Sequence, residues 1–111
     1  MPTPGNLVVV DSTPLISLDA CNQLELLRAL YGQIVVPEAV EQELVRGGKT
    51  GLSQGLTRAH RKWIQIRRLR ASPAPSLLAV LDLGEAEVIA LAVELGTPLV
   101  IIDEREAHAE D

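Results

Sequence analysis

The stretch GNLVVVDSTPLISL (residues 5–18) joins a short apolar run directly to an aspartate. Residues 7–10 are continuously apolar, which is typical of a buried strand in a parallel sheet. Thr13 and Pro14 then predict a helix start, with Thr13 as the N-cap and Pro14 at the first helical position. Asp11 would lie outside that cap. Because a carboxylate at the end of a buried strand must be neutralised or put to chemical use, the role of Asp11 depends on the rest of the chain.

Apolar runs and helix signals alternate along the remaining sequence. Further strands are predicted at residues 34–36, 63–69 and 98–102, and helices at 22–31, 37–46, 56–62 and 82–95. Asn22 with Glu25 indicates a capping box, and the strand at 63–69 is expected at a sheet edge. This alternation predicts an α/β fold with a central parallel sheet.

Composition narrows the class of protein. The chain has 111 residues, so we expect one domain over residues 1–111. Apolar residues make up 47% of the chain and aromatic residues 2%, which indicates a core of Leu, Val, Ile and Ala. No apolar run approaches the roughly 20 residues of a membrane span. A single cysteine gives no internal disulfide or thiolate metal site, so a cytoplasmic protein without a membrane partner is expected.

Charge is segregated along the sequence. The net charge is −5, yet residues 58–70 contain six arginines and lysines and no acid. This basic segment includes Arg58, Arg61 and Lys62, which could contact RNA phosphates or form an ordinary solvated face.

Acidic residues follow the predicted strands at the positions where ligands bind in α/β sheets. Asp11 and Asp103 both come directly after an apolar strand, so we expect them to converge at the carboxyl edge of the sheet. In the helix 82–95, Glu85 lies on the apolar face, whereas Glu87 and Glu94 share the opposite face. The sequence favours equally a role for Glu85 in a functional site and a role in a capping box at the start of the helix.

In a second acidic helix, at residues 37–46, the pattern does not decide which glutamate faces inward. Val40 and Leu44 mark the inward stripe, and Glu41 and Glu43 flank it at comparable angles. Asp11, Asp103 and Glu85 with one of these glutamates would form a carboxylate cluster, in which like charges raise each other's pKa. Mg²⁺ or Mn²⁺ would relieve this repulsion, and a phosphodiester is the substrate class that such a site favours.

Four stretches together resemble the PIN domain family: VVVDSTPLI (8–16), IVVPEAVEQEL (34–44), LDLGEAEVIALA (81–92) and LVIIDERE (99–106). The resemblance implies a three-layer α/β/α fold. It also implies a further helix and edge strand after Asp103, for which only eight residues remain, so a shortened member is expected.

The resemblance also assigns residues to a site. It implies Asp11, Glu43, Glu85 and Asp103 as catalytic, metal-binding acids, with Glu104 as a substitute for Asp103 and Ser12 as a hydroxyl partner for the substrate. Family members are similar in holding Mg²⁺ or Mn²⁺ against RNA, and many are toxins paired with a protein antitoxin. We therefore expect an endoribonuclease. Because a shortened chain would expose a sheet edge that can pair with another copy, we also expect homo-oligomers. A catalytically inactive module that binds RNA or a protein partner is the alternative.

Overall fold

A computed structural model describes residues 7–47, 51–97 and 99–102. Four strands form a parallel sheet in the order β3-β2-β1-β4. They are β1 (Val8–Val10), β2 (Ile34–Pro37), β3 (Ile64–Arg67) and β4 (Leu99–Ile101). The predicted α/β class with a parallel sheet is confirmed, and β3 lies at an edge as expected. Asp103, Glu104 and the elements implied beyond them lie outside the described residues.

The order of the strands reverses at β1. The chain steps from β1 to β2 to β3 in one direction, and β4 then pairs with the other side of β1. The carboxyl ends of β1 and β4 therefore flank a topological switch point, which is where open α/β sheets bind their ligands.

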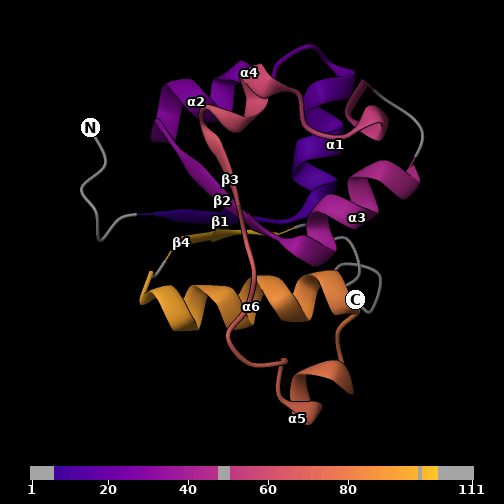
Figure 1. Ribbon diagram of the computed structural model, residues 1–111, viewed down its shortest axis with the longest axis vertical. Coiled ribbons are helices and arrows are strands. Elements are labelled where there is room, and N and C mark those ends of the chain that lie inside the picture. The colour runs from indigo at the N-terminus through magenta and orange to yellow at the C-terminus, as the bar shows by residue number, and fades with distance from the viewer. Residues whose placement is uncertain (1–6, 48–50, 98, 103–111) are drawn as a thin grey trace, which may run out of the picture.

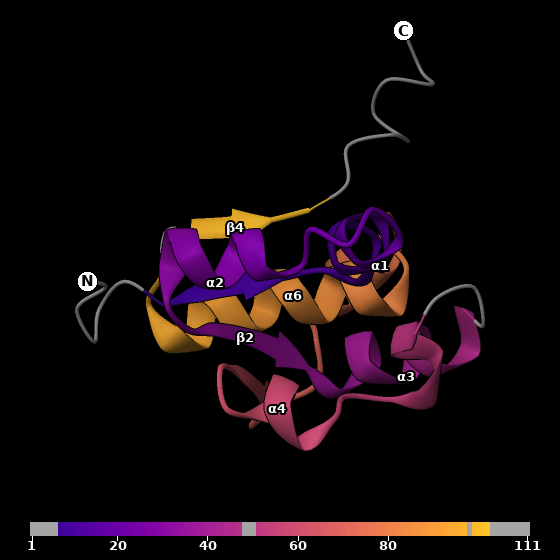
Figure 2. The ribbon, with the colours of Figure 1, turned by 90° about the horizontal axis from the view of Figure 1, so that it is seen from above.

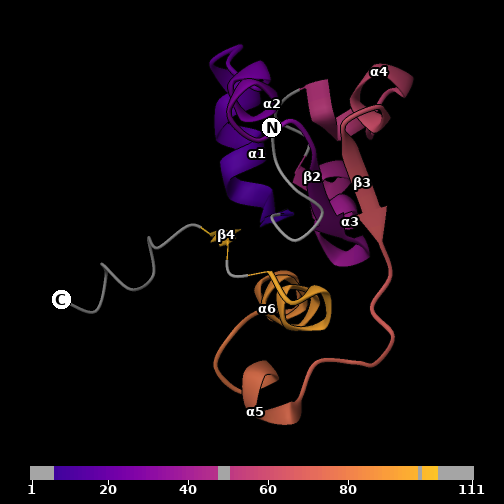
Figure 3. The ribbon, with the colours of Figure 1, turned by 90° about the vertical axis from the view of Figure 1, so that its left-hand side faces the viewer.

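Helices cover both faces of the sheet. They are α1 (Ser12–Ala20), α2 (Glu25–Tyr31), α3 (Glu38–Gly47), α4 (Arg58–Arg61), α5 (Pro75–Leu78) and α6 (Leu83–Leu95), with a 3-10 helix, η2, at Gly51–Gln54. Figures 1 and 3 show α6 and α5 below the strands and α1, α2 and α4 above them. Right-handed crossovers explain the division, because the connection to β4 runs in the opposite direction to the earlier two. The result is the three-layer arrangement that the resemblance implies.

Aliphatic side chains fill the core, as the composition predicts. Val8, Val9, Val10, Ile34, Val35 and Val36 on the two central strands are all at most 1% exposed. Leu15, Leu44 and Leu91 bring α1, α3 and α6 into the same cluster. None of the helices within the described ranges has the length and apolarity needed to cross a membrane.

The predicted start of α1 is wrong by two residues. The N-cap is Asp11, not Thr13, and the Asp11 carboxylate accepts a hydrogen bond of 2.7 Å from the Ser12 N–H. Pro14 is the third helical residue. Because the N–H groups of the first helical turn have no partner within the helix, proline is tolerated there as well as at the first position.

The predicted capping box at Asn22 is also wrong. Asn22 has a φ of +57°, and α2 begins at Glu25 after Leu24, which makes no side-chain cap bond. The N–H groups of Asn22 and Gln23 instead donate to Asp19 O and Leu18 O, at 3.0 and 2.8 Å. This is a Schellman motif, in which a left-handed asparagine ends the preceding helix.

The predicted ends of α6 agree with the structure. Asp82 Oδ1 accepts from the Glu85 N–H at 2.8 Å, and Gly96 ends the helix in the left-handed conformation with a φ of +67°. The two acids on the opposite face of α6 both bind backbone amides of neighbouring segments. Glu87 Oε1 accepts from Ala39 N at 3.2 Å, and Glu94 Oε1 accepts from Arg70 N and Ala71 N at 2.9 and 3.3 Å.

We expect Glu87→Ala to lower the free energy of unfolding by about 1 kcal/mol, the usual cost of losing a helix cap. Glu87 acts as a cap supplied from another helix, because Ala39 is in the first turn of α3. Urea denaturation measures the change. Glu25→Ala is the matched control, since Glu25 is exposed and, within the described ranges, its ion pair is with Arg28 at 3.6 Å. Equal losses in the two variants would contradict the capping role.

Candidate functional site

Asp11 lies at the carboxyl end of β1, at the switch point. Its backbone N–H donates to Ile101 O of β4 at 2.9 Å, so the residue extends the pairing between the two strands. Its side chain is only 4% exposed, although it carries a carboxylate. The strand thus delivers Asp11 to the sheet edge that the sequence predicts.

Glu43 of α3 reaches the same place through Ser12. The Ser12 hydroxyl, in a residue 5% exposed, donates to Glu43 Oε2 at 3.4 Å. Figure 2 shows α1 and α3 at the same end of the strands, which is why residues 31 positions apart can meet. Ser12, expected as a partner of the substrate, contacts this acid.

The other oxygen of Glu43 has an unusual environment. Glu43 Oε1 is buried and has no hydrogen-bond partner among the described residues. Burial raises the pKa of the Glu43 carboxyl above its ordinary value of 4.5, and the negative charges of Asp11 and Asp82 raise it further. The Ser12 hydrogen bond and the Arg46 charge oppose this rise. Within the part of the chain that the structure describes, the Glu43 carboxylate therefore forms no ion pair, although the Arg46 charge acts on it.

A cavity of about 530 Å³ opens beside Glu43. It is lined by Ala39, Glu43, Arg46, Asp82, Leu83 and Gly84. Two acids and one arginine thus meet where the start of α6 approaches α3. A site of this composition can accept a divalent cation through its carboxylates and an anionic phosphate through its guanidinium.

The remaining predicted acids are placed less completely. Glu85 is half-buried in the first turn of α6, one residue after Gly84 of the cavity wall. Asp103 lies outside the described residues. Within the described ranges, no three Asp, Glu, His or Cys side chains form a group that could hold a metal ion. The structure therefore brings Asp11 and Glu43 together through Ser12 and adds Asp82 to them.

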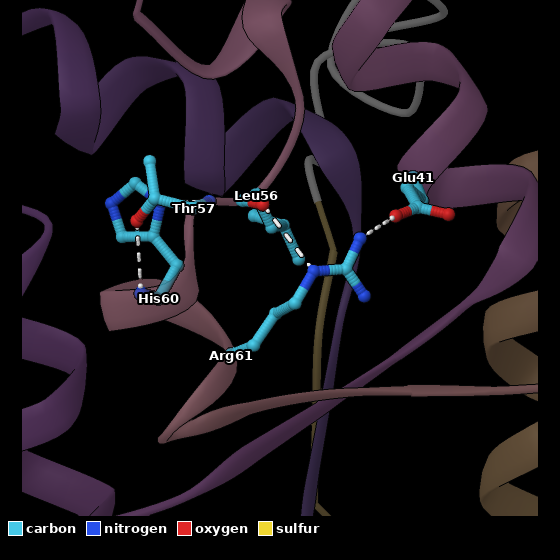
Figure 4. A network of polar contacts seen from close by, with 5 residues as sticks. All are labelled: Glu41, Leu56, Thr57, His60 and Arg61. Atoms are coloured by element: carbon cyan, nitrogen blue, oxygen red, sulfur yellow. Dashed lines mark hydrogen bonds and ion pairs between the residues drawn. The ribbon is translucent and has the colours of Figure 1, made fainter.

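The predicted RNA-binding cations lie on or next to α4. Arg58 and Arg61 belong to α4, which precedes the amino end of β3, whereas Asp11 follows the carboxyl end of β1. The Arg61 guanidinium donates to Glu41 at 3.1 Å and to Leu56 O at 3.3 Å (Figure 4). Lys62 directly follows the same helix and is exposed.

The same network contains the cap of α4. The Thr57 hydroxyl accepts from His60 N at 3.1 Å, and His60 Nδ1 accepts from Thr57 N at 3.2 Å (Figure 4). The contact between Arg61 and Glu41 also distinguishes the two glutamates between which helical periodicity could not choose. Glu41 pairs with α4, whereas Glu43 faces Ser12.

The second half of the basic segment reaches the edge that carries Asp11. Arg67 is in register with Pro37 at the carboxyl end of β3, and Arg68 pairs with Glu38 at 3.5 Å. β3 therefore separates Arg58, Arg61 and Lys62, which precede the strand, from Arg67 and Arg68 at its carboxyl end.

Sequence reasoning missed three residues of the cavity. Arg46 follows Glu43 by three positions and so shares its helix face, a signal that was available in the sequence. Asp82 fits the sequence pattern as the first residue of a capping box with Glu85, which gave no reason to place it in a site. Gly84 was not singled out, although a glycine inside a helical pattern often has a packing reason.

A family model described as a PIN domain (DUF3368) matches residues 7–110. The chain belongs to the PIN domain family. No curated protein and no solved structure gives a significant match to it. PIN domains are generally nucleases that typically use divalent metal ions. In this PIN domain, Asp11 and Glu43, whose buried Oε1 has no hydrogen-bond partner among the described residues, offer oxygen atoms of the kind that hard cations prefer.

Proposed function

We propose that this PIN domain is a Mg²⁺- or Mn²⁺-dependent endoribonuclease. The observation that carries the proposal is the placement of Glu43 beside Ser12 and Asp11 at the switch point, with one carboxylate oxygen buried and lacking a partner among the described residues. Such an arrangement is costly for folding unless it serves a bound cation.

Asp11, Glu43, Glu85 and Asp103 would hold the ion under this proposal. A bound Mg²⁺ or Mn²⁺ supplies a water of lowered pKa and stabilises the charge that develops on the phosphate. Asp11 and Glu43 contribute negative charge from two separate elements, and the Ser12 hydrogen bond fixes the orientation of the Glu43 carboxylate. The first turn of α6 supplies Glu85 next to the cavity.

Arg46 is the cation best placed to bind the substrate. It lines the cavity with Glu43 and Asp82, it is exposed, and its positive charge acts on Glu43. A guanidinium at this point can hold a phosphate oxygen while the acids remain available for a metal. Arg67 and Arg68 at the same sheet edge would extend the path of an RNA backbone, and the α4 cations would serve only a longer strand.

The direct test is cleavage of a labelled single-stranded RNA by the purified chain. We expect internal fragments with Mg²⁺ or Mn²⁺ and no cleavage with excess EDTA, because the proposed reaction depends on the bound metal. Restoration of activity by adding metal after EDTA would separate this reaction from a contaminating metal-independent ribonuclease. Absence of cleavage with every divalent metal tested would overturn the proposal and favour a catalytically inactive binding module.

The same proposal includes a toxin role with a protein antitoxin as partner. It is supported by the similarity of the four sequence stretches to PIN toxins, and it predicts that the nuclease slows growth when expressed alone. Growth without impairment from an expressed, RNA-cleaving protein would argue against this role and leave the nuclease assignment intact.

A further inference from the structure

Gly84 occupies the second position of α6 and is buried. Its φ lies outside the left-handed region, so the backbone does not require glycine. Alanine would be the better helix former at such a position. Some other constraint therefore favours a residue without a side chain.

The constraint is the carboxylate of Glu43. A Cβ built on Gly84 would overlap Glu43 Oε1, and it would lie 2.7 Å from Glu43 Cδ and 3.3 Å from Oε2. The three heavy atoms nearest to this Cβ all belong to the Glu43 side chain. The space left by the missing side chain is thus the space that the carboxylate fills.

We propose that Gly84 is a positioning residue, which holds the Glu43 carboxylate in the cavity by leaving room for it against the first turn of α6. Ser12 fixes Oε2 from the other side, so the carboxylate is held between the starts of α1 and α6. The consequence for metal binding rests on the proposed function, whereas the packing relation does not.

Gly84→Ala would move a flexible carboxylate, not the backbone. The overlapped atoms are at the end of a glutamate side chain, which can rotate away toward the solvent. Such a rotation breaks the contact with Ser12 and takes one oxygen out of the cavity. We therefore expect a folded protein with a misplaced acid.

A double-mutant cycle tests the packing relation without any metal. The four proteins are the wild type, Gly84→Ala, Glu43→Ala and the double variant, unfolded by urea in EDTA at about pH 4, where the Glu43 carboxyl is mostly protonated and its charge does not oppose folding. In the Glu43→Ala background, Gly84→Ala should raise the folding equilibrium constant about two- to fivefold, which is the gain of alanine over glycine in a helix. With Glu43 present, the same substitution should give no gain or a loss. The same gain in both backgrounds would overturn the proposal.

Failure of Gly84→Ala to fold is also informative. Restored folding in the double variant would support the proposal, because removal of Glu43 would then remove the clash. Failure of both proteins would contradict it, since position 84 would be sensitive for reasons unrelated to Glu43.

Mn²⁺ binding, measured from the electron paramagnetic resonance signal of free Mn²⁺, adds the functional readout. We expect Gly84→Ala to weaken Mn²⁺ binding by at least about tenfold. Losses of this size are typical when a residue that orients a metal ligand is changed. If the wild type binds Mn²⁺ and Gly84→Ala binds it equally well, the positioning role fails. If the wild type neither binds Mn²⁺ nor cleaves RNA while the cycle shows coupling, the proposed function fails and the packing relation stands.

Discussion

Asp11→Asn should reduce RNA cleavage on the order of 10²–10³-fold, as expected when a group that stabilises the reacting charge is removed. The amide keeps the shape of the side chain and can still accept the hydrogen bond from the Ser12 N–H, so α1 retains its cap. What is lost is the negative charge at the switch point. Initial rates of RNA cleavage at saturating Mn²⁺ measure the effect, with circular dichroism to confirm the fold.

Asp19→Asn is the matched control for this substitution. Asp19 lies on the same helix and is half-buried, but it is two turns away from the sheet edge. It should leave the cleavage rate unchanged, and an expressed Asp19→Asn protein should slow growth as the wild type does, unlike Asp11→Asn. Equal cleavage by Asp11→Asn and the wild type would remove Asp11 from the site and with it the nuclease assignment.

Glu43→Gln should abolish cleavage and yet stabilise the metal-free protein. The pKa of Glu43 is raised in the folded state, chiefly by burial and then by Asp11 and Asp82, so its charged form opposes folding. The stability associated with a raised carboxyl pKa is fully present below the ordinary value of 4.5 and is lost as the pH rises through the folded-state pKa. At pH 8 in EDTA, the variant should gain about 0.5–2 kcal/mol, the range typical of relieving such a functional cost.

The pH dependence makes this prediction specific. The gain from Glu43→Gln should shrink as the pH falls through 4.5, below which the wild-type carboxyl is mostly protonated in both the folded and the unfolded state. Glu41→Gln is the control two residues earlier on α3, because Glu41 pairs with Arg61 at 3.1 Å. It should cost at most about 1 kcal/mol, as exposed ion pairs do, and should spare cleavage. A Glu43→Gln protein that is less stable than the wild type at pH 8 would contradict the claim that the charged Glu43 carboxylate opposes folding.

The fold could be predicted from sequence because its signals are local. Short apolar runs gave β1, β2 and β4, and glycines 32 and 96 end α2 and α6 where the pattern indicates. The errors arose where neighbouring residues compete for one role. Asp11 and Thr13 both qualify as N-caps, and Asn22 suits a helix end as well as a helix start, so the choice depends on the packed chain.

The candidate site could be predicted only in part, because its decisive contacts are long-range. Periodicity could not choose between Glu41 and Glu43, and the structure separates them through Arg61, 20 positions from Glu41, and Ser12, 31 positions from Glu43. Gly84 illustrates the same limit, because its contact with the Glu43 carboxylate of another helix produces no pattern in the neighbouring sequence. Helical periodicity likewise gives no sign that Glu87 caps α3, because its partner Ala39 lies 48 positions away.

Anomalous diffraction from crystals soaked in Mn²⁺ tests the central claim most directly. The claim is that acids from the end of β1 and from α3 share one cation site at the switch point. An anomalous peak within ligand distance of the Asp11 carboxylate and Glu43 Oε1, absent from Glu43→Gln crystals, is the predicted result. A peak confined to other acids, or no peak at saturating Mn²⁺ with the two carboxylates paired to basic side chains, would contradict it.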